Sequence, residues 1–294
     1  MKNGTLEAES QKLRGLLTKA ISASFKSTDT IGLLFSGGLD SSLLAVLLSN
    51  IHSEPIPLFV TGVESAKDII LAREVARFLK LPLTIRFFAV DEVREKLPEI
   101  LSIISEVDVL QVELAIPLFF VTECAKQFNI TTLFTGQGAD ELFGGYARHE
   151  QQFLQSGERA SLKEMEKDFA KLLEVILPSQ IAVVHHFGIN LATPYLNGTL
   201  VEFSHQLPFS CKLSKSSQGV IRKRLLRELA YKLGIPPQFA NASKRAFQYG
   251  SGTHRVLVDL AIEYWSQKNP GLSKREAGTH SRINEYLLQT KTGL

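Results

Sequence analysis

Residues 31 to 48 read IGLLFSGGLDSSLLAVLL, and this stretch decides the fold. Its first five residues are mostly apolar and predict a buried strand, and its last residues predict an apolar helix. The turn between them contains Gly37 and Gly38, which allow φ > 0 and let backbone amides curl round an anion. Hydroxyl donors are added by Ser36, Ser41 and Ser42. Because a helix N-terminus carries partial positive charge, the stretch predicts a phosphate site.

Asp40 lies among these donors, where an isolated carboxylate would repel phosphate. Its position is therefore best explained by a divalent metal that also contacts the phosphates. The stretch is neither a P-loop, since G-x-x-x-x-G-K-[ST] is absent, nor a dinucleotide fingerprint of the G-x-G-x-x-G type. A tight turn with a serine helix cap is the simpler alternative, but the density of glycine, serine and aspartate favours a phosphate loop.

Composition is that of an ordinary globular protein of one to two domains, with 294 residues, 44% hydrophobic and 21% charged. No apolar run reaches the length of a membrane span, and the first residues, MKNGTLEAES, are polar, so neither a span nor a secretory signal is predicted. We therefore expect a cytoplasmic protein without a membrane partner. The two cysteines, Cys124 and Cys211, have no metal or disulfide spacing, which fits a reducing compartment. A net charge of +3 permits nucleic acid as a partner but does not require it.

Apolar periodicity predicts strands alternating with helices along the first half of the chain. The expected strands are 31–35, 56–60, 83–90 and 132–134, and the expected helices are 6–26, 66–79, 92–104 and 114–128. Such alternation predicts βαβ crossovers and a parallel sheet. The domain division expected is an N-terminal helix at 1–26, an α/β core at 27–150, a helical lobe at 151–265 and a polar tail at 266–294.

A second informative stretch, TGQGADELFGGY, occupies residues 135–146 directly after the fourth predicted strand. Its four glycines keep the backbone close to a ligand, and Asp140 and Glu141 supply carboxylates. Taken alone it could be a loop that caps a helix. Ligands of parallel sheets lie beyond the carboxyl ends of the strands, so we expect the loops 36–42, 61–68 and 135–146 to converge on one cleft.

The pair of stretches, SGGLDSS followed about a hundred residues later by GQGADELFGGY, resembles the synthetase domain of the asparagine synthetases and the related β-lactam synthetases. Further matches follow in the family's order: AKDIILAREVARFL, DVLQVELAIPLFF, FGINLATPYLN and SKRAFQYG. The resemblance covers roughly residues 10 to 255. It implies an α/β fold with a parallel-sheet core like that of the adenine-nucleotide α-hydrolases, the N-type ATP pyrophosphatases, and a helical C-terminal lobe.

The resemblance also implies roles for individual residues, with ATP and Mg²⁺ as cofactors. The matches to the pyrophosphate loop are Ser36, Gly37, Gly38, Asp40, Ser41 and Ser42. The matches to positions that wrap the nucleoside are Leu34, Thr61 and Gly136. Asp40 and Asp140 match the magnesium-holding pair, and Lys244 matches a lysine beside the reacting phosphate. Gln137 matches the residue that faces the acceptor, where asparagine synthetases carry glutamate.

Other departures from the family pattern concern charged groups. Val220 follows Gly219 where relatives carry lysine, so one phosphate-side lysine is absent unless Lys215 or Arg222 reaches in. Three further charged positions of the family are Asn190, Leu191 and Asn197 here, which predicts either a changed acceptor pocket or an inactive enzyme. A basic stretch of Arg222, Lys223, Arg224 and Arg227 is expected to be a solvated helix face, with a phosphate or RNA contact as the alternative.

The activity implied is ATP-dependent amide formation, in which a carboxylate becomes an acyl-adenylate with release of pyrophosphate and then reacts with ammonia or another amine. The alternatives are a tRNA-modifying ATP pyrophosphatase and a nucleotide-binding subunit without chemistry. The chain begins MKNG and enters the synthetase helix at once, so no glutaminase domain is expected. The expected partners are a small-molecule carboxylate, ammonia or another amine, and a second copy of the chain in a homodimer. Ammonia would be free or delivered by a separate glutaminase subunit.

Overall fold

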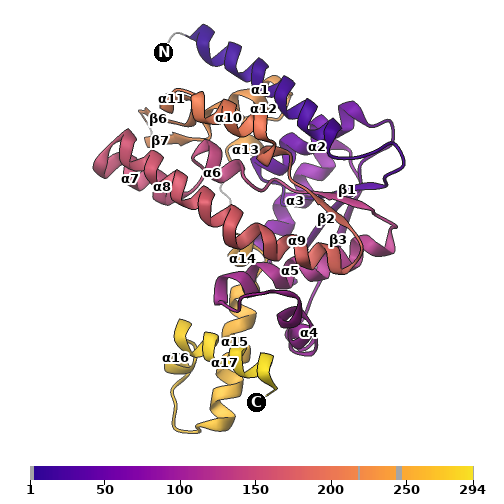
Figure 1. Ribbon diagram of the computed structural model, residues 1–294, viewed down its shortest axis with the longest axis vertical. Helices are drawn as coiled ribbons and strands as arrows, with labels where there is room; N and C mark the ends of the chain where they lie inside the picture. Colours follow the sequence, from indigo (N-terminus) through magenta and orange to yellow (C-terminus); the bar gives the residue numbers. More distant parts are fainter. Residues whose placement is uncertain (1–2, 218, 243–246, 294) are drawn as a thin grey trace.

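Five parallel strands form the centre of the protein in the computed structural model, which describes residues 3–217, 219–242 and 247–293 (Figure 1). They are β1 (Ile31–Leu34), β2 (Leu58–Gly62), β3 (Leu83–Phe87), β4 (Thr132–Phe134) and β5 (Asn190–Ala192). The parallel α/β fold predicted from the sequence is confirmed. The fifth strand was not predicted, because a three-residue strand becomes one only through its pairing with β4.

The order of the strands is β3-β2-β1-β4-β5, so the direction of winding reverses at β1. Leu33 of β1 aligns with Leu58 of β2 on one side and with Phe134 of β4 on the other. A crevice forms at such a reversal, outside the carboxyl ends of the two central strands. The loops that follow β1 and β4 are SGGLDSS and TGQGADE, so the topology brings both motifs to one edge of the sheet.

Helices cover both faces of the sheet. One face packs on α1 (Asn3–Ala23), α2 (Leu39–Ile51), α3 (Lys67–Leu79) and α12 (Arg224–Lys232). The other packs on α4 (Val90–Ile103), α5 (Val109–Gln127) and α9 (Leu177–His186). Strand β2 shows why both layers form, since Leu58 and Val60 join the first apolar core whereas Phe59, between them, joins the second.

Shorter elements connect β4 to α12. They are α6 (Ala139–Phe143), α7 (Ala147–Ser156), α8 (Glu158–Lys171), the π-helical turn η1 (Leu172–Ile176), the 3₁₀ turn η2 (Pro194–Leu196), α10 (Gly198–Gln206) and α11 (Phe209–Lys212). An antiparallel hairpin of β6 (Leu213–Ser216) and β7 (Gly219–Arg222) then leads directly into α12. The hairpin therefore fixes the position of Lys223, the residue that joins it to α12.

The last helices are α13 (Pro237–Ala240), α14 (Phe247–Gly250), α15 (Thr253–Lys268), α16 (Lys274–Ala277) and α17 (His280–Thr292). The segment expected as a polar tail thus contains a helix that packs on α4, α5 and α15, at the end of the molecule opposite the N-terminus (Figure 1). Its buried residues, Ile283, Tyr286 and Leu287, recur at helical spacing. None of the described helices is long and apolar enough to cross a membrane.

Candidate active site

A pocket of about 900 Å³, including its open mouth, lies at the carboxyl ends of the strands. The three loops expected to converge all contribute to its wall, which confirms that prediction. The contributing residues are Ser36, Asp40 and Ser41 from the first loop, Thr61 and Asp68 from the second, and Thr135, Gly136, Gln137 and Asp140 from the third. Apolar side chains of β1, β2 and α5 complete the pocket, including Leu34, Phe59, Leu114 and Leu118.

The first loop has the geometry of an anion cradle. Gly37 has φ 71°, and a Cβ there would lie 2.8 Å from the backbone nitrogen of Ala72, so only glycine fits. The backbone N–H of Gly38 donates to Ser36 Oγ at 3.3 Å, and Ser36 Oγ lies 3.3 Å from Ser41 Oγ. These long hydrogen bonds hold the hydroxyls loosely at the N-terminus of α2, where an anion would compete for them.

Lys223 joins the two aspartates that the sequence singled out. Its Nζ lies 2.8 and 2.7 Å from the carboxylate oxygens of Asp40 and 2.7 Å from Oδ1 of Asp140. Lys223 is only 8% exposed; burial by itself would lower the pKa of its ammonium, but the two carboxylates outweigh burial and raise it. Gly145 passes so close that a side chain there would collide with both Asp140 and Lys223. The sequence therefore needs glycine at this position.

The expected role of the basic stretch was wrong for Lys223, which is buried rather than solvated. Of the two residues considered as substitutes for the lysine absent at position 220, Lys215 is exposed on β6, and Arg222 pairs with Glu150 at 3.3 Å. The cation beside Asp40 and Asp140 is Lys223 instead. Its only local signal was its place between a hairpin and the Leu-Leu-Arg-Glu helix, which the hydrophobic pattern alone does not mark.

The two carboxylates fit a magnesium ion shared with phosphates. Asp40 and Asp140 come from different loops, yet their oxygens contact the same ammonium, so they lie close enough to hold one cation. Mg²⁺ commonly uses one or two carboxylates and takes its remaining ligands from substrate phosphates and water. Among the described residues there is no cluster of three His, Cys, Asp or Glu side chains that would form an all-protein cage. A bound cation would compete with Lys223 for the same oxygens.

The other residues predicted for the site are distributed as follows. The pocket is lined by Leu34, Ser36, Ser41, Thr61 and Gly136. Gly37, Gly38 and Ser42 are not among the lining residues, and Ser42 Oγ donates to the carbonyl oxygen of Gly37 within the first loop. Leu191 also lines the pocket. Asn197 instead caps α10, because its Oδ1 accepts from the backbone N–H of Thr199 at 3.2 Å. Lys244 lies outside the described residues.

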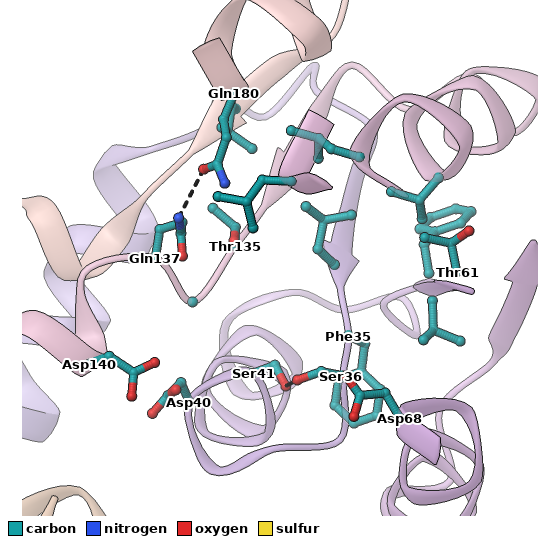
Figure 2. A pocket seen from close by; sticks show the side chains of 18 residues that line it. Phe35, Ser36, Asp40, Ser41, Thr61, Asp68, Thr135, Gln137, Asp140 and Gln180 are labelled. Carbon is teal, nitrogen blue, oxygen red and sulfur yellow. Dashed lines mark hydrogen bonds between the residues drawn. The ribbon is translucent and has the colours of Figure 1, made fainter. Parts of the chain in front are cut away.

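Gln137 forms a side-chain pair that the sequence did not suggest. Its Nε2 donates to Oε1 of Gln180 at 3.0 Å, and Gln180 comes from α9 (Figure 2). Figure 2 shows the pair above Ser36 and Ser41 of the first loop, with Asp40 and Asp140 below Gln137. Both amides line the pocket, so the pocket wall is uncharged at this point.

Glu141 lies next to Asp140 and is almost fully buried. Burial and, to a smaller extent, the neighbouring charge of Asp140 raise its pKa to about 7, although the hydrogen bond that Glu141 accepts from the Tyr146 hydroxyl at 2.6 Å opposes the rise. In the folded protein this carboxyl therefore holds its proton across a range of pH in which an unfolded chain has lost it.

We expect Glu141→Gln to stabilise the protein at pH 8 relative to wild type, and to have little effect at pH 5. Because the folded pKa lies above the unfolded value, wild-type stability is lost as pH rises from about 4.5 to about 7, by about 3 kcal/mol in full. Glutamine keeps an acceptor for Tyr146 without a charge. Urea unfolding of both proteins at the two pH values measures the difference, and a constant difference would contradict the assignment.

Comparison with known proteins shows which family the chain belongs to. The sequence profile of the asparagine synthase family matches residues 12–184 and 155–286. The chain belongs to the asparagine synthase family. The protein named asparagine synthetase (glutamine-hydrolyzing) 1 of Methanocaldococcus jannaschii is 31% identical over 98% of this chain and 56% of its own length. Asparagine synthetase (glutamine-hydrolyzing) of Mus musculus is 27% identical over 83% of this chain and 44% of its own.

This asparagine synthase family member thus spans about half the length of the curated relatives it matches. Among solved structures, NMN synthetase from Francisella tularensis aligns over 98% of this chain and 93% of its own, at 12% identity and a TM-score of 0.44. The parallel sheet with helices on both faces and the pocket at the strand ends agree with the α/β fold expected from the sequence.

Proposed function

We propose that this family member is an ATP-dependent ligase that joins a carboxylate to ammonia or another amine. The observation that carries the proposal is the contact of Lys223 with Asp40 and Asp140 beside a glycine- and serine-rich loop. This arrangement supplies hydroxyl and ammonium donors for phosphates and two carboxylates for a divalent cation, all at one end of the pocket. The family relationship supports the same reaction class.

In the proposed reaction an oxygen of the substrate carboxylate forms a bond to the α-phosphorus of ATP, and the bond from that phosphorus to the bridging oxygen breaks. The products are an acyl-adenylate and pyrophosphate. Ser36, Ser41 and the amides near Gly38 orient the phosphates, and Lys223 stabilises the charge that develops on the leaving group. Mg²⁺, when bound at Asp40 and Asp140, neutralises phosphate charge. An amine then attacks the acyl carbon, AMP leaves, and a proton is released.

Two parts of the proposal rest on the family resemblance. Lys244 is proposed as a second cation at the reacting phosphate. Ammonia is proposed to come either from solution or from a glutaminase, because the matched relatives are named as glutamine-hydrolyzing.

The direct test is release of pyrophosphate from Mg-ATP in the presence of candidate carboxylates, with and without ammonium. We expect release that depends on a carboxylate, and formation of an amide that depends on the amine. ATP turnover that depends on tRNA instead would favour the nucleic-acid alternative. Tight ATP binding with no pyrophosphate release for any carboxylate or tRNA would indicate a binding subunit and refute the proposal.

A further inference from the structure

The Gln137–Gln180 pair indicates which hydrogen-bonding groups the substrate carries, whereas the residues at the phosphate end of the pocket do not. Each amide has one carbonyl and one NH₂ group, and the bond between them uses one carbonyl and one N–H. The pair therefore presents a carbonyl acceptor from one side chain and an NH₂ donor from the other to the pocket. Whichever amide donates within the pair, the second N–H of that amide and both N–H groups of the other are left over, so this surface combines a carbonyl acceptor with N–H donors.

Hydrogen bonds that begin at the preceding residue, Ser179, hold Gln180 in position. The hydroxyl of the preceding residue, Ser179, donates to Oε1 of Gln111 on α5. Gln111 Nε2 in turn donates to the second carboxylate oxygen of Asp108 at 3.1 Å, and Asp108 caps α5 through the backbone N–H of Leu110. This chain of hydrogen bonds ties the start of α9 to the start of α5. Gln180, which is only 8% exposed, is thereby held at the pocket wall.

The charged side chains of the pocket wall also favour an uncharged group at the far end of the substrate. The charged side chains among the described residues that line the pocket are Asp40, Asp68 and Asp140, and all three are acidic. The nearby ammonium of Lys223 already contacts two of these carboxylates. A second carboxylate on the substrate would face these acids, and it has no donor for the carbonyl of the amide pair. A neutral group with both a donor and an acceptor would satisfy the pair completely.

We infer that the substrate is an acid whose far end is an uncharged donor–acceptor group, a carboxamide or its equivalent, bound by Gln137 and Gln180. The inference rests on the proposed function in one respect, since the other end of the ligand is the carboxylate to be activated. A carboxamide matches the pair group for group. A dicarboxylate leaves the carbonyl of the pair unpaired and adds repulsion, which together weaken binding by a factor of about 10 or more.

The test uses matched ligands that differ only at the far end: succinamate against succinate, glutaramate against glutarate, asparagine against aspartate, and glutamine against glutamate. Binding is measured by calorimetry and by the shift in Tm, in the presence of Mg²⁺ and α,β-methylene-ATP, which cannot be cleaved at the reacting bond. We expect at least one carboxamide to bind about 10-fold more tightly than its dicarboxylate partner. Equal or tighter binding of the dicarboxylates, or no binding of any acid by a protein that binds the nucleotide, would overturn the inference.

Gln180→Met provides the second arm, because it keeps the length of the side chain and removes both polar groups. We expect this variant to lose the preference for the carboxamide about 10-fold while nucleotide binding is retained. The matched control is Gln127→Met, at the exposed C-terminal end of α5. A preference that survives in Gln180→Met would also refute the inference.

Pyrophosphate release is scored separately with ATP. Carboxamide binding without release supports the substrate assignment but refutes the proposed function. Release with dicarboxylates in preference to carboxamides supports the proposed function but refutes the substrate assignment.

Discussion

Asp40→Asn and Asp140→Asn are each expected to abolish pyrophosphate release, with a loss of about 10³-fold or more. The two carboxylates come from different loops and contact one ammonium in the structure, so they form one cation site rather than two. Asparagine keeps the shape but offers a neutral oxygen, which Mg²⁺ binds poorly. Either substitution therefore removes half of the charge that would hold the metal against the phosphates.

The measurement is pyrophosphate release at saturating ATP and substrate, combined with ATP affinity determined with and without Mg²⁺. Affinity without the metal should change much less than turnover, because the serine hydroxyls and backbone amides of the first loop are retained. Asp91→Asn is the matched control, since the Asp91 side chain is 87% exposed on α4. Wild-type turnover in either active-site variant would show that the metal pair is assigned incorrectly.

Lys223→Met is expected to lower both stability and activity. Without the ammonium, two neighbouring carboxylates, one of them buried, lose the cation that they share, and breaking such a contact destabilises a protein by about 3–5 kcal/mol. The corresponding fall in Tm is on the order of 10 °C. Turnover should fall by about 10²- to 10³-fold, the scale for one preorganised donor to developing charge.

Two further measurements separate charge from packing. Mg²⁺ alone should raise the Tm of Lys223→Met more than that of wild type, because the cation no longer competes with the ammonium for Asp40 and Asp140. Adding Asp140→Asn to Lys223→Met should restore part of the lost stability, because one of two neighbouring like charges disappears. Lys215→Met, on an exposed position of β6, is the matched control. A variant as stable as wild type, or one indifferent to Mg²⁺, would contradict the role of Lys223.

The sequence by itself determined the parallel sheet and the edge at which the site forms. Both follow from local physics, since apolar periodicity sets the elements and the glycines of SGGLDSS and TGQGADE set the turns. The winding of parallel strands then places consecutive βα loops at the same edge, and the pocket contains all three expected loops. Apolar spacing also marked Ile283, Tyr286 and Leu287, but the polar composition around them hid this signal.

The tertiary structure alone decided which side chains meet. Lys223 reaches Asp40 from 183 residues away, and Gln180 pairs with Gln137 across 43 residues. A lysine in a basic stretch is ordinarily solvated, and its burial becomes favourable only when two carboxylates from other loops surround it. Likewise, β5 exists because β4 offers it an edge. Such contacts depend on long-range folding, so local sequence patterns specify the loops of this site but not the pairs that determine its charge and selectivity.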